Sequence, residues 1–280
     1  MGVIQFILNA RRFMCGKNAM SPPRVITSLP LLALMCCGTL SAGPGNVAPD
    51  KWEQHAPPDI VPIIKVLNDM NIPLKHRIAF ADDQVPEVRR QLLNYVHRLN
   101  GIELQKSVAF FFLRNDKDRN MRIAAVSSLG NVKPMDQETI DVLTDVINDE
   151  APMVQSFACQ TICFAQISPQ VDMTKAFAAL MNAVDTKDAG QDFSVAKSAV
   201  RALGWQGHEP SRQRIVRFFK DNKDNPSAAC ICAESLARLG GADDTLLHTI
   251  SVSLSSSNWN IRHMGAKELG KCQSRRSSHF

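Results

Sequence analysis

The sequence predicts an all-α protein, an α-solenoid of about six helical hairpins, from three observations. Apolar residues recur along the chain at a spacing of 33 residues, and a constant period is typical of a repeat array. Within each copy these positions lie four residues apart, as they would on one face of a helix. Aromatic residues make up only 6% of the chain, which disfavours a β-sandwich or β-barrel because their strands depend on aromatic and β-branched residues.

The clearest copy of the repeat runs from Met121 to Gly130. Met121, Ala125 and Leu129 occupy offsets 0, 4 and 8, so they share one helical face. Small residues on that face allow a neighbouring helix to approach closely. The segment is therefore predicted to be a packing helix.

Six first apolar positions define the repeat. They are Val88, Met121, Val154, Val195, Ala228 and Ile261. Their separations are 33, 33, 41, 33 and 33 residues. The long interval contains a polar stretch, residues 185–192, which we expect to form a loop.

A second apolar helix is expected between successive copies. The expected ranges are residues 63–70, 107–113, 139–147, 212–219 and 245–254. Gly, Asn, Asp and Pro punctuate the joins between helices. Each hairpin is too small to bury its own apolar face, so stacking of the hairpins is expected to create one continuous core.

These copies resemble HEAT repeats, in particular the short type of phycobilisome-lyase-like proteins. The family pattern is an apolar residue, Arg, two small residues and then Leu-Gly. Met121-Arg122, Ala124-Ala125 and Leu129-Gly130 match it fully. The copies that begin at Val195 and Ile261 match in part, whereas the copy at Val154 departs most, with Ile162-Cys163 in place of Leu-Gly.

The resemblance covers about residues 60–272 and implies the fold more specifically than the function. Related repeats occur in lyases that act on bilin chromophores, so a ligand-handling or lyase-type enzyme subunit is the alternative function. No set of residues in this chain supports lyase chemistry. We therefore expect a protein that is not an enzyme.

The N-terminal region resembles a secretory signal peptide. Arg24 precedes a charge-free run from Val25 to Gly43, with an apolar core and small residues at its end. The run is short for a membrane span and contains Pro30, so we expect no stable membrane span. The competing interpretation is a buried N-terminal helix.

The expected organisation has four parts. Residues 1–43 form a signal peptide with an upstream extension that ends before Met20, residues 44–59 a linker, residues 60–272 the repeat array and residues 273–280 a C-terminal tail. The expected location is exported, periplasmic or secreted. A lipoprotein anchor fits less well, because Met35-Cys36 precedes Cys37 where a small residue is typical.

The charge distribution argues against a nucleic-acid partner. Residues 1–42 contain four basic residues and no acid, which leaves 28 Lys+Arg against 27 Asp+Glu in the remainder. Proteins that neutralise many phosphates normally have a basic excess in the folded domain. We therefore expect no nucleic-acid binding by the repeat array.

Metal and catalytic motifs are weak in this chain. Cys159 and Cys163 on one helix and the pair Cys230 and Cys232 suggest a zinc site. However, the pairs belong to copies that are not neighbours, and three of the four cysteines occupy repeat positions that other copies fill with small or apolar residues, as buried cysteine commonly does. The seven histidines are scattered and form no H-E-x-x-H pair. We expect no metal, no cofactor and no catalytic residue.

Arg89, Arg122 and Arg262 each follow the first apolar position of a copy. In the family that the chain resembles, such an arginine pairs with an acid in a neighbouring turn. Asp82, Asp83, Asp116 and Asp118 are the candidate partners. These arginines are therefore expected to stabilise the structure.

Offsets 2 and 6 point away from the apolar face, so they are expected to line the inner surface of the array. The candidate partner-binding residues among them are Arg90, Asn94, Ser127, Gln160, Lys197, Arg201, Glu234, His263 and Lys267. The alternative is an ordinary solvated face. Because this set is polar and modestly basic, the expected function is an exported protein-interaction scaffold that binds an acidic or polar segment of a protein partner.

Overall fold

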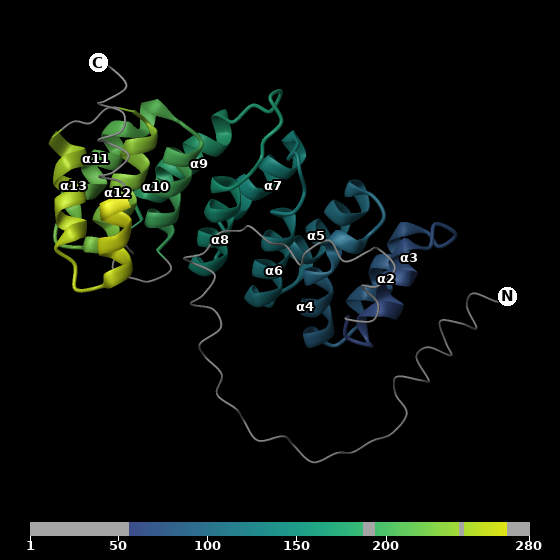
Figure 1. The fold of residues 1–280 in the computed structure, drawn as a ribbon. Coiled ribbons are helices and arrows are strands. Elements are labelled where there is room, and N and C mark those ends of the chain that lie inside the picture. The colour runs from purple at the N-terminus through teal and green to yellow at the C-terminus, as the bar shows by residue number, and fades with distance from the viewer. Residues whose placement is uncertain (1–55, 187–193, 241–243, 268–280) are drawn as a thin grey trace, which may run out of the picture. The chain divides into compact units, whose positions relative to one another are not determined.

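The computed structural model describes residues 56–186, 194–240 and 244–267. Within these ranges all regular secondary structure is helical, and the β-type pairing is limited to an isolated bridge between Met135 and Ile167. The all-α class is thus confirmed (Figure 1). The predicted signal peptide, most of the linker, the tail at 273–280 and most of the polar insert lie outside the described residues.

The helices follow one another along the chain (Figure 1). The first group is α2 (Ile60–Asn68), α3 (Leu74–Asp82), α4 (Pro86–Asn94), η3 (Val96–Arg98), α5 (Ile102–Asn115), α6 (Arg119–Leu129) and α7 (Gln137–Val146). The second group is α8 (Pro152–Cys163), α9 (Thr174–Val184), α10 (Val195–Trp205), η4 (Glu209–Ser211), α11 (Arg212–Asp221), α12 (Pro226–Arg238) and α13 (Asp244–Leu254). A further helical stretch covers residues 259–267.

Helices pack in a regular pattern of neighbours. Within hairpins, α5 packs on α6, α7 on α8, α9 on α10 and α11 on α12. Between hairpins, the second helices α4, α6, α8, α10 and α12 each pack on the next, and the first helices α7, α9 and α11 do the same. The second helices therefore form a row of neighbours, and the side chains at offsets 2 and 6 lie along this row.

Burial follows the predicted apolar face. Offsets 0, 4 and 8 are at most 1% exposed in α6, α8, α10 and α12. They are Met121, Ala125 and Leu129; Val154, Ala158 and Ile162; Val195, Ala199 and Leu203; and Ala228, Cys232 and Leu236. The prediction of a shared core face is therefore confirmed for these four helices.

The N-terminal end contains one helix more than predicted. Helix α2 covers most of the predicted range 63–70 and packs on α4, whereas α3 lies between them in the chain and packs on α2 and α5. Only Arg77 and Ala81 are buried in α3. Because α3 lacks an apolar stripe, a search for apolar periodicity passes over it.

Short polar side chains and prolines set the starts of several helices. Asp118, Ser194 and Asn225 accept hydrogen bonds from backbone N–H groups in the first turns of α6, α10 and α12. These N–H groups have no partner inside the helix, so a capping side chain stabilises the helix start. Proline occupies the first turn of α4, α8 and α12, where its missing N–H costs nothing.

The four described cysteines are free and buried. Burial raises the pKa of the Cys163 and Cys232 thiols well above the ordinary value, which disfavours the thiolate that metal binding and redox chemistry require. The expectation that these cysteines behave as small core residues is confirmed. Within the described ranges, no helix is long and apolar enough to span a membrane.

Asp136 links the start of α7 to the buried Lys106 of α5. Its carboxylate accepts hydrogen bonds from the backbone N–H of Thr139 and from Lys106 Nζ, at 3.0 and 2.7 Å. Burial raises the pKa of Asp136, but the hydrogen bonds from Lys106 and Thr139 outweigh burial and lower it to about 2. Lys106 also contacts Glu138 at 2.9 Å, and these partners raise its pKa despite burial.

We expect Asp136→Asn to lower the free energy of unfolding by about 1 kcal/mol near neutral pH, because it keeps the helix cap but removes the negative charge that pairs with the buried Lys106. The pKa of Asp136 is lower in the folded state, so its stabilising effect is present above the ordinary value of 3.8 and disappears as the pH falls towards about 2. The free energies of unfolding of the variant and the wild type should therefore converge as the pH falls, which urea denaturation at decreasing pH measures. Asp145→Asn, at an exposed site on α7, is the control; a difference at Asp136 that stays constant with pH would contradict the assignment.

Candidate protein-interaction surface

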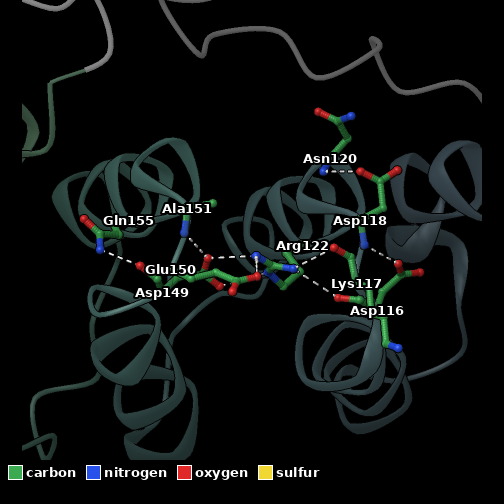
Figure 2. Close-up of polar contacts among 9 residues, drawn as sticks. All are labelled: Asp116, Lys117, Asp118, Asn120, Arg122, Asp149, Glu150, Ala151 and Gln155. Carbon is green, nitrogen blue, oxygen red and sulfur yellow. Dashed lines mark hydrogen bonds and ion pairs between the residues drawn. The ribbon is translucent and has the colours of Figure 1, made fainter.

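Arg122 joins the connection between α5 and α6 to the connection between α7 and α8 (Figure 2). Its Nε and Nη2 donate to the two carboxylate oxygens of Asp149, both at 2.9 Å, and Nη2 also lies 3.2 Å from Glu150. Its Nη1 donates to the carbonyl oxygens of Asp116 and Lys117. The paired geometry suits the planar guanidinium group. Arg122 thus ties the turn before α6 to the turn before α8.

The same position has an equivalent role in other copies. Arg89 donates to the Asp82 carbonyl oxygen and lies 3.1 Å from the Asp116 carboxylate. Arg262 donates to the carbonyl oxygens of Ser256 and Ser257, and Gln155 donates to that of Asp149. The expected pairing with an acid in a neighbouring turn is confirmed for Arg89 and Arg122. Among the described residues, Arg262 instead bonds to backbone carbonyl groups of the turn before it. The carboxylate partner of Arg122 is Asp149, which was not among the candidate acids.

The predicted partner-binding residues divide by exposure. Arg90, Asn94, Ser127, His263 and Lys267 are exposed on α4, on α6 and in residues 259–267. Gln160, Arg201 and Glu234 are half-buried, and Lys197 is only 7% exposed. Arg90 forms an ion pair with Glu87 of its own helix. The residues on α8, α10 and α12 are thus the ones held in contact with neighbouring elements.

Side chains from α10 and α12 form an ordered cluster around Glu234. The Glu234 carboxylate accepts hydrogen bonds from Arg201 Nε at 3.2 Å and from Trp205 Nε1 at 3.1 Å. The Arg238 guanidinium group stacks over the Trp205 ring, 3.3 Å from its centroid. Glu234 has only 12% of its side chain exposed. It therefore positions Arg201 and Trp205 and presents little surface of its own.

Phe164 extends the cluster onto the end of α8. Its ring meets the Trp205 ring edge to face, with centroids 5.1 Å apart. Phe164 is 44% exposed and Trp205 37% exposed. We name Phe164, Arg201, Trp205, Glu234 and Arg238 the aromatic–arginine cluster. It combines exposed aromatic surface with two cationic side chains.

The arginines of the cluster keep unused hydrogen-bond donors. A guanidinium group has five N–H donors, and within the described part of the chain Arg201 uses only its Nε–H. Arg238 Nη2 comes within 3.8 Å of Glu234 Oε1, but Arg238 forms no hydrogen bond with any described residue. Donors with partial access to solvent and no protein acceptor are available to a ligand with acceptor oxygens.

A polar contact continues this row towards α8. The hydroxyl groups of Ser156 and Ser198 are 2.8 Å apart, and Gln160 Nε2 lies 3.2 Å from the Ser156 oxygen. Ser156 and Gln160 occupy offsets 2 and 6 of α8. These groups hydrogen-bond to one another between α8 and α10, so they hold the two helices in register. The groups that remain available to a partner are those of the cluster.

Phe164, Trp205 and Arg238 were not among the predicted partner-binding residues, although one signal in the sequence identifies them. All three are at offset 10 of their copies, the next position on the stripe that contains offsets 2 and 6. The repeat pattern used for the prediction ends at the Leu-Gly pair, so offset 10 falls just outside it. In the structure α10 continues through Gly204 to Trp205 and α12 reaches Arg238, so the stripe is one turn longer.

No protein-family model matches the sequence, and no curated protein is significantly similar to it.

Proposed function

We propose that this protein is a HEAT-like α-solenoid that acts as an exported protein-interaction scaffold and binds its partner through the aromatic–arginine cluster. The observation that carries the proposal is the cluster itself. Solvent-exposed Trp and Phe beside ordered Arg is the composition of energetically important contacts in protein interfaces. The regular neighbour packing of the second helices and the 33-residue period support the solenoid arrangement.

The cluster meets a second requirement for binding, which is order before the partner arrives. Glu234 fixes both Arg201 and Trp205, and Arg238 is stacked on the indole. Side chains that are already fixed lose less conformational entropy on binding. We propose no catalytic role for the cluster, because its residues include no nucleophile and no paired general acid and base.

Photocrosslinking in intact cells tests the proposal. A benzoylphenylalanine at position 164 replaces an exposed phenylalanine with a related ring, and a second probe at Ser127 samples the same row of helices. Probes at Asp145 on α7 and Gln213 on α11, both exposed on first helices, are matched controls. We expect the same partner protein to be crosslinked from position 164, and from position 127 at lower yield, with little product from the controls.

The same experiment tests export. After crosslinking, cells are fractionated and the products identified by mass spectrometry. We expect the crosslinked, processed chain outside the cytosol. Recovery of only the unprocessed chain in the cytosol would contradict export, and equal crosslinking from positions 164 and 213 would contradict the assigned surface.

A further inference from the structure

The accessible charge of the aromatic–arginine cluster is positive. Arg201 and Arg238 have 23% and 31% of their side chains exposed, against 12% for Glu234. The Glu234 carboxylate faces Arg201 and Trp205, so its charge is directed into the cluster. The unused guanidinium donors are the polar groups offered to a ligand. Carboxylates match guanidinium groups in both charge and planar geometry.

The same cluster offers an apolar contact next to those donors. Phe164 and Trp205 lie edge to face, and the Arg238 guanidinium group covers one face of the indole. The exposed parts of these two rings can pack against a large apolar side chain, and aromatic side chains contribute much of the binding energy at interfaces. A ligand that carries only negative charge would leave this surface uncovered.

We propose that the cluster binds a short acidic segment of a partner protein in which a carboxylate side chain lies beside a large apolar side chain. The carboxylate takes the free N–H groups of Arg201 and Arg238, and the apolar side chain packs on Phe164 and Trp205. This inference rests on the proposed function, because it specifies the chemistry of the partner at the same surface. A polyphosphate backbone is the weaker match, because residues 43–280 carry 28 basic and 27 acidic residues.

Selection of random twelve-residue peptides displayed on phage, with the full chain as target, tests the inference. The expected result is a set of peptides enriched in Asp or Glu next to Leu, Phe or Trp. Synthetic copies of these peptides are then compared with versions in which Asn or Gln replaces the acids. We expect binding to weaken about tenfold or more, the size expected for loss of a charge-assisted hydrogen bond. This comparison leaves the protein unchanged, so it cannot be confused with misfolding.

Protein variants locate the contact. Arg201→Gln is expected to weaken binding about as much as removal of the acids, and Arg201→Lys less, because Lys keeps the charge but loses the planar donors. Lys220→Gln, at an exposed site on α11, is the charge-matched control. With Trp52 and Trp259 changed to Phe, Trp205 is the remaining tryptophan of the chain. Its fluorescence should then change on titration with the acidic peptide.

The outcomes separate this inference from the proposed function. Peptides that depend on Arg201 and perturb Trp205 but lack acidic residues would overturn the acidic-segment inference and leave the interaction surface standing. If no peptide is selected, or if the selected peptides bind equally well to the Arg201→Gln variant and leave Trp205 unperturbed, both the inference and the assigned surface fail.

Discussion

Replacing Arg122 with methionine is expected to lower the free energy of unfolding by about 3 to 5 kcal/mol, the usual cost of removing one partner of a buried ion pair. The Arg122 and Asp149 side chains are only 9% and 13% exposed. Methionine fills a similar volume but removes both hydrogen bonds from the guanidinium group to the Asp149 carboxylate, which keeps, among the described residues, only its bond from the Ala151 N–H group. It also removes the donor to the carbonyl oxygens of Asp116 and Lys117. Urea denaturation measures the loss.

Arg119→Met is the matched control for this prediction. Arg119 is exposed at the start of the same helix, so its replacement should change stability by less than about 0.5 kcal/mol. A double-mutant cycle with Asp149→Asn isolates the pair. The Arg122→Met change should cost less in the Asp149→Asn background. Equal losses for Arg119→Met and Arg122→Met would show that Arg122 does not hold the two turns together.

The second large effect is expected at Gly204, which lies where α10 packs on α12. Among the described glycines, it is the one at which an added Cβ atom would come closest to a neighbouring residue. A Cβ atom added there would lie 2.5 Å from both Cα and Cβ of Ser235. Ser235 is buried and its hydroxyl donates to the Val200 carbonyl oxygen, so it cannot move aside without breaking that bond. Gly204→Ala is expected to destabilise the fold by about 2 to 3 kcal/mol through overpacking.

Gly130 provides the control for Gly204. It follows the equivalent leucine in α6, but a Cβ atom there would meet Ser127 O at 3.1 Å and Thr161 Cγ2 at 3.7 Å. Small shifts relieve contacts of this size, so Gly130→Ala should change the free energy of unfolding by less than about 1 kcal/mol. Thermal and urea unfolding of both variants give the comparison. A smaller loss at Gly204 than at Gly130 would contradict the close approach of α10 and α12.

The core was predictable because one period governs both sequence and burial. Ala125 and Ala158 are buried at the offset that a helical face requires, and their copies are related by a constant spacing. The helix α3 was missed because it buries only Arg77 and Ala81. Its position is fixed by packing on its neighbours α2 and α5, and a pattern of apolar residues within the segment does not contain that information.

The helical stripe that carries the candidate surface was predictable from the sequence, but the contacts between its residues were not. Arg201 and Glu234 lie on the predicted stripe, yet their mutual hydrogen bond depends on how closely α10 and α12 approach. Trp205 was not predicted because it directly follows Leu203-Gly204, where the repeat pattern ends. In the structure Gly204 permits close packing of a helix that continues to Trp205. Lys197 is on the same stripe and is buried, which periodicity alone does not reveal.

We propose that the aromatic–arginine cluster contacts a protein partner in the cell. The most direct test of this claim is the ratio of crosslinking yields from benzoylphenylalanine at position 164 and at position 213, measured in intact cells. We predict one dominant partner protein from position 164, little from position 213, and loss of the position 164 product when Arg201 is changed to Gln. Equal yields from the two positions, or a product unaffected by Arg201→Gln, would contradict the claim.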